Sequence, residues 1–154
     1  MVHFPWRASL IVAAILCPLR VVSAGDAETL SKLLLPVDLA QNFAVMCSLH
    51  NPSFLQATSG VHGSMLWYAR HMKEEIIASL PKSEVSAVLV EAADMAKAEA
   101  LKVIHRMASD GVVDAAQLNA WCGASAKTFI KATIARHDTQ HALLDEAIAK
   151  AKQR

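Results

Sequence analysis

The chain has 154 residues, enough for one domain and too few for two of ordinary size. Its formal charge is +1, and Lys and Arg are spread along the sequence without a basic stripe, so we expect no nucleic-acid partner. There are only five Gly and five Pro, and the β-branched residues do not alternate with polar ones. This composition predicts an all-α fold.

The first 24 residues have the three-part form of a secretory signal peptide. Arg7 supplies the positive start, an apolar run covers 8–16, and small residues at 22–24 precede Gly25. The apolar run is short for a membrane span, which needs about 20 residues. We therefore expect cleavage after Ala24, a periplasmic or secreted protein, and a single domain over 25–154 that is not in a membrane.

Removal of this segment changes the charge and cysteine counts. Without Arg7 and Arg20, 13 of the 15 basic residues face 14 acidic ones, so the mature chain is nearly neutral. A lipoprotein built on Cys17 is the alternative, although the leucine before it is large for a lipid-modifying cleavage site. Two cysteines remain, Cys47 and Cys122, and an even count in an exported protein predicts a disulfide between them. Two buried free thiols are the other possibility.

Four segments of the mature chain show helical spacing of apolar residues. They are 37–49, 65–80, 83–111, and a last one that begins at the capping residue Asp114. Polar residues then interrupt the apolar stripe near 137–139, which indicates either a separate C-terminal helix or a helix that runs past the core. Short connections between the later helices favour an antiparallel bundle of about four helices, stapled by Cys47–Cys122.

The segment 83–111 is the longest predicted helix, and we expect the bundle to be organised around it. Ser83 is its expected N-cap, and Gly111 follows its last periodic residues. Its apolar arc covers about half of the circumference, which is more than one neighbouring helix can bury. This helix should therefore have at least two partners.

The motif with a known mechanism is His137-Asp138-Thr139-Gln140-His141. On a helix, His137 and His141 lie on one face one turn apart, and Asp145 continues the line. The arrangement suggests a Zn or Cu site, with a solvated helix end as the simpler explanation. His71, on the polar side of its helix beside Glu75, is expected to be exposed.

No nucleophile, paired carboxylate or phosphate loop forms a catalytic arrangement, so we expect no enzyme and no cofactor. The leading functional hypothesis is an exported helical protein that binds another protein, as a partner, a chaperone or an immunity-type inhibitor. The candidate interface is the loop from Phe54 to Gly63, with Trp67 and Tyr68 near it. Trp67 lies on the polar side of its helix, where an exposed aromatic can anchor an interface, and a contact within the chain is the alternative. Metal binding through His137, His141 and Asp145 is the alternative.

Overall fold

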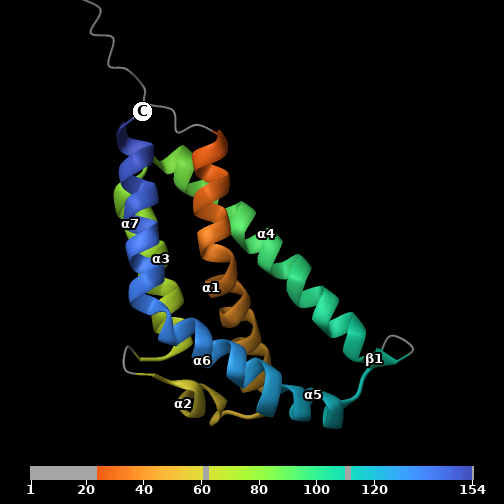
Figure 1. The fold of residues 1–154 in the computed structure, drawn as a ribbon. Coiled ribbons are helices and arrows are strands. Elements are labelled where there is room, and N and C mark those ends of the chain that lie inside the picture. Colours follow the sequence, from red (N-terminus) through yellow and green to blue (C-terminus); the bar gives the residue numbers. More distant parts are fainter. Residues whose placement is uncertain (1–23, 61–62, 110–111, 154) are drawn as a thin grey trace, which may run out of the picture.

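The structure is a computed structural model that describes residues 24–60, 63–109 and 112–153, so the predicted signal peptide lies almost entirely outside the described residues (Figure 1). It is mostly helical, which confirms the predicted class. The elements are α1 (Ala24–His50), α2 (Phe54–Thr58), α3 (Met65–Ser79), α4 (Lys82–Met107), β1 (Ala108–Ser109), β2 (Val112–Val113), α5 (Ala115–Trp121), a π-helical turn (Cys122–Ala126), α6 (Lys127–Ala135) and α7 (His137–Gln153).

The central element is α1, and α3, α4, α6 and α7 all pack on it (Figure 1). The buried side chains of α1 recur at helical spacing along its whole length: Leu30, Leu34, Val37, Ala40, Phe43, Ala44 and Cys47. The helix has the length and hydropathy of a membrane span from Gly25 to His50. This finding rests on length and composition only, and 39% of the apolar window is buried inside the fold.

The expectation that α4 organises the fold is wrong. Only Val88, Ala92 and Ala96 are buried along α4, on one stripe that faces α1. On its other sides, Val90 is 57% exposed and Leu101 is 42% exposed. The small alanines let α4 approach α1 closely, and α4 then diverges diagonally from α3 and α7 (Figure 1). Most of the rest of its apolar arc packs at the margin of the core, while Val90 and Leu101 stay exposed.

The N-terminal half of α1 also differs from the prediction, which began this helix at Val37. The structure places Pro36 inside α1, although proline cannot donate a hydrogen bond to the carbonyl four residues earlier. Next to that position, the Gln140 side chain donates to the carbonyl of Leu33 over 2.6 Å. One turn earlier, Ser31 donates to the carbonyl of Val88. Tertiary contacts of this kind stabilise the helix where local sequence disfavours it.

Three helix boundaries follow the predicted signals. The side chain of Ser64 accepts from the amide of Trp67 at the start of α3, and Asp114 accepts from that of Ala116 at the start of α5. Arg136 leaves helical geometry between α6 and α7, so of the two alternatives the structure has the separate C-terminal helix, with its break just before 137–139. The start of α4 differs, because Pro81 rather than Ser83 occupies the capping position.

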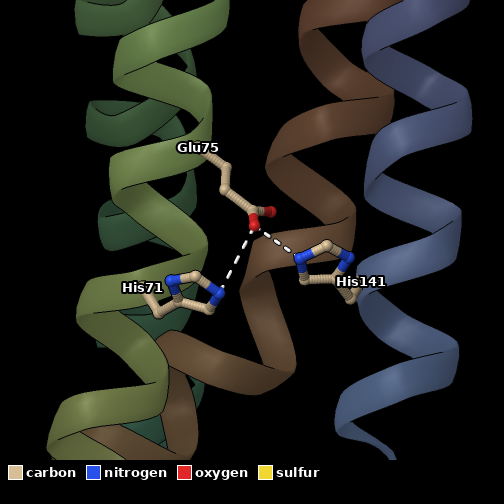
Figure 2. A group of neighbouring side chains, drawn as sticks. All are labelled: His71, Glu75 and His141. Carbon is tan, nitrogen blue, oxygen red and sulfur yellow. Dashed lines mark ion pairs between the residues drawn. The ribbon is translucent and has the colours of Figure 1, made fainter.

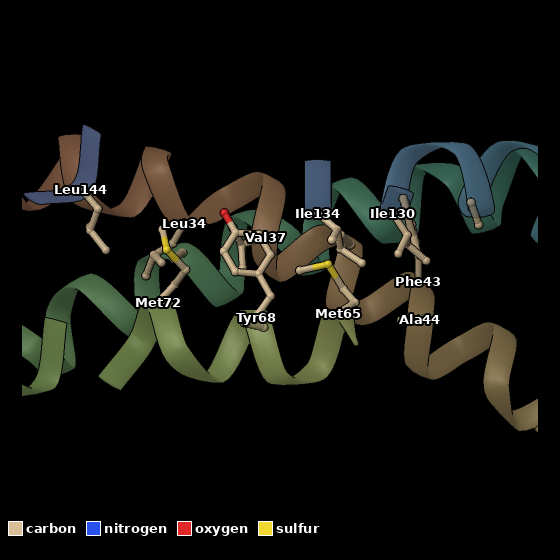
Figure 3. Close-up of a cluster of buried hydrophobic side chains, with 14 of the residues drawn as sticks. Leu34, Val37, Phe43, Ala44, Met65, Tyr68, Met72, Ile130, Ile134 and Leu144 are labelled. Carbon is tan, nitrogen blue, oxygen red and sulfur yellow. The ribbon is translucent and has the colours of Figure 1, made fainter. Parts of the chain in front are cut away.

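The core that fixes α3 and α7 against α1 is a continuous apolar layer (Figure 3). Met65, Met72 and Ile76 of α3 are fully buried, and Leu144 of α7 meets them over α1. At the edge of this layer, Lys73 of α3 forms an ion pair with Asp38 of α1 at 2.5 Å and donates to Gln41. The relative position of α3 and α7 is thus set by packing beneath them.

The predicted disulfide is present in the structure. The sulfur atoms of Cys47, near the end of α1, and Cys122, at the π-helical turn, lie at bonding distance, and their Cα atoms are 5.7 Å apart. Both side chains are buried. The link closes a loop over 75 residues and ties the chain after α4 back to α1.

Loss of this link should destabilise the fold. The double variant Cys47→Ser, Cys122→Ser is expected to lose about 4 kcal/mol of unfolding free energy or somewhat less, because the unfolded chain regains the entropy of a long loop. Urea unfolding with and without a reductant measures this. The wild type should become less stable on reduction, and the stability of the double variant should not change. Equal urea midpoints for the two proteins without reductant would contradict the prediction.

Candidate metal centre

Chemically reactive side chains gather where α3 and α7 lie side by side. His71 and Glu75 are one helical turn apart on α3, and His137 and His141 are one turn apart on α7. On each helix the neighbouring stripe is buried in the core, which turns these residues to the edge of the α3–α7 contact. Packing of the core therefore brings two pairs of metal-ligand residues together.

Three of these side chains point toward one another (Figure 2). The Oε1 atom of Glu75 lies 3.4 Å from Nε2 of His71 and 2.5 Å from Nε2 of His141. The three ligand atoms all lie within 4.8 Å of one another. Zinc sites with bonds of about 2.0–2.1 Å separate their ligand atoms by roughly 3.4 Å, so small side-chain movements suffice to surround an ion.

The outer side of the cluster resembles the surroundings of known metal ligands. Nδ1 of His141 lies 3.2 Å from Oδ2 of Asp145, one turn further along α7. Metal-bound histidines usually hold a carboxylate with the other ring nitrogen, which fixes the orientation of the ring. Asp145 can serve His141 in this way. The side chains of His71, Glu75 and His141 are each 21–37% exposed, so the cluster is accessible to an ion from solvent.

A stack of rings borders the cluster. The indole of Trp67 lies against His71 at 5.1 Å between centroids and an interplanar angle of 18°. His71 in turn is nearly parallel to His137, at 6.1 Å and 4°. Tyr68 covers His137 from the core side at 4.8 Å. The rings thus form a stack along one side of the cluster, with the indole of Trp67 at its end.

The sequence identified part of this site. Of the predicted metal ligands, His141 belongs to the cluster, Asp145 contacts only its outer ring nitrogen, and the ring of His137 lies 5.8 Å from that of His141. His71 and Glu75 were expected to be solvated. Their spacing of four residues was a signal of the same kind as that of the two histidines, but only the fold shows that the two pairs face each other.

The predicted interface residues are not a continuous surface. Phe54 is 5% exposed and Tyr68 is 1% exposed, so both belong to the core. Trp67 is 46% exposed, and His71 covers one face of its indole. Of the three, only Trp67 therefore remains available to a partner.

The hydroxyl of Tyr68 is buried and has no hydrogen-bond partner among the described residues. Burial raises the pKa of Tyr68 to about 12, and the negative charges of Glu75 and Asp138 add to the shift. The phenol therefore stays neutral at physiological pH. It borders the cluster as a neutral side chain and does not supply an anionic ligand.

Because Tyr68 is the only tyrosine, its ionisation can be followed directly by ultraviolet absorbance. The folded protein should form tyrosinate near pH 12, and the urea-unfolded chain near pH 10. Since the folded pKa is raised, this contribution to stability is complete below pH 10 and is lost as pH rises to 12, by roughly 2–3 kcal/mol. A folded midpoint near 10 would contradict the burial of the hydroxyl.

Comparison with known proteins gives no family for this chain: no family model matches it, and neither a curated protein nor a solved structure matches it significantly.

Proposed function

We propose that the chain is an exported metal-binding protein in which His71, Glu75 and His141 hold a divalent ion of the Zn²⁺ or Cu²⁺ class. The observation that carries this proposal is the convergence of two imidazole nitrogens and one carboxylate oxygen, from two helices, within 4.8 Å. Export rests on the form of residues 1–24 and on the Cys47–Cys122 pair, since disulfides persist in oxidising compartments.

The donor set favours this class of ion. Imidazole suits zinc, copper and nickel, whereas Mg²⁺ and Ca²⁺ prefer sites made entirely of oxygen ligands. Glu75 contributes one negative charge, so a divalent ion would leave the site with a single positive charge, which Asp145 partly offsets from behind His141. These features support a binding role, and we propose no reaction.

A second candidate retains the hypothesis of a protein partner. It is supported by the exposed face of Trp67, because a half-exposed indole on a rigid helix is a common anchor of interfaces. The burial of Phe54 and Tyr68 leaves this candidate with a smaller surface than the sequence suggested. Capture of a partner from periplasmic extract by the wild type, lost in Trp67→Ala, would favour this second role.

Isothermal titration of chelator-treated protein with Zn²⁺ tests the proposal. We expect one ion per chain in the wild type and a loss of affinity in His71→Ala, Glu75→Gln and His141→Ala that exceeds the roughly 10–100-fold cost of losing an outer partner. Affinity should also fall in acid, because protons compete with the ion for imidazole.

The exposed His105 on α4 provides the matched control. His105→Ala should bind as the wild type does, which separates the site from general histidine binding. No binding at micromolar Zn²⁺ or Cu²⁺, or binding that is unchanged in His141→Ala, would refute the proposal.

The outer contact gives an independent prediction. Asp145→Asn should weaken Zn²⁺ binding by about 10–100-fold without removing it, because the ring of His141 loses the carboxylate that orients it. Glu146→Gln is the control, since Glu146 pairs with Lys150 on the solvent side of the same helix. Titration of both variants under the same buffer distinguishes them; equal affinities would exclude a role for Asp145.

A further inference from the structure

We infer that His137 is the fourth ligand of this site, so that the bound ion is enclosed by three imidazoles and one carboxylate. The inference rests on the proposed function and specifies the ion as Zn²⁺. A closed site with four protein ligands suits the tetrahedral geometry of Zn²⁺, whereas Cu²⁺ favours tetragonal sites.

The first argument is the symmetry of the two helices. His71 and Glu75 on α3 are separated by four residues, and so are His137 and His141 on α7. Residues at this spacing lie above one another on one face of a helix. Two such pairs on neighbouring helices place four donor side chains around one point, and the cluster so far uses only three of them.

Distances support a place for His137 in this group. Its ring centroid lies 6.1 Å from that of His71 and 5.8 Å from that of His141. The rings of His71 and His141 are themselves 5.7 Å apart. The three imidazoles are therefore nearly equidistant, and His137 is almost as close to the other two as they are to each other.

His137 also has the outer partner that a metal ligand usually has. Its Nδ1 lies 2.9 Å from Oδ1 of Asp138, as Nδ1 of His141 lies against Asp145. In both residues a carboxylate holds the same ring nitrogen, so both would ligate through Nε2. This repeated arrangement is not needed for packing, because Asp138 and Asp145 are both exposed on α7.

Burial gives His137 a distinct position in the site. Its side chain is 10% exposed, against 37% for His71 and 30% for His141, and it lies against Tyr68. His137 thus occupies the inner side, where it would close the site toward the core. Its ligand atom is outside the 4.8 Å group, so ligation requires the His137 side chain to reorient, and the exposed carboxylate of Asp138 must move with Nδ1 to keep their contact.

Cobalt provides the probe, because Co²⁺ bound by four ligands in a tetrahedral site absorbs visible light far more strongly than the same ion with five or six ligands. Wild-type protein loaded with Co²⁺ should show intense visible bands that do not change when azide is added. His137→Gln should still bind Co²⁺ through three protein ligands, with water in the fourth position, and azide should change its bands by replacing that water. Its affinity for Zn²⁺ should fall at least tenfold.

Asp138→Asn keeps the ring and removes only its partner, so it serves if His137→Gln is poorly folded by circular dichroism. It should retain the intense bands with roughly tenfold weaker Zn²⁺ binding. His50→Ala, on the exposed end of α1, should match the wild type. Wild-type bands that respond to azide, or equal Zn²⁺ affinity in His137→Gln, would overturn this inference while leaving the proposed function intact. Absence of any metal binding by the wild type would overturn both.

Discussion

Burial of α1 by the rest of the chain is the constraint on which this structure depends. Each large apolar side chain that leaves water contributes about 1.5–3 kcal/mol, and α1 supplies Leu30, Leu34, Val37 and Phe43 to that contact. The helices α3 and α7 are held in register with each other mainly through this shared support (Figure 3). The arrangement of histidines and carboxylates at their edge is therefore a product of core packing, and no local motif determines it alone.

The sequence predicted the helical class, the cysteine pair and several boundaries because these depend on local chemistry. A capping side chain such as Asp114 acts within one turn, and a break at polar residues near Arg136 is visible in the apolar pattern. The prediction failed at Pro36, where distant contacts from Gln140 support the helix. It also failed for α4, because the width of an apolar arc does not show how much of its surface other helices will bury.

The candidate site was predictable only in part, because local spacing is visible in the sequence and contacts between helices are not. The spacing of His137 and His141 is visible in one helix, and so is that of His71 and Glu75, but facing of the two pairs is a tertiary property. Exposure was misjudged in both directions. The polar side of α3 is partly covered by α7, and Tyr68, expected at a surface, lies under the histidines with its pKa raised by burial.

The contact between Gln140 and Leu33 has a consequence for α7 as a whole. Gln140 lies between His137 and His141 in sequence, and its side-chain amide donates to the carbonyl of Leu33 on α1, in the turn that precedes Pro36. This segment therefore makes two contacts from neighbouring positions on α7: its imidazoles lie toward α3, and Gln140 binds a carbonyl of α1. A slip of α7 by a single residue would rotate it by about 100° and lose both engagements together. Residues 137–141 therefore determine both the register of α7 on α1 and the position of the imidazoles.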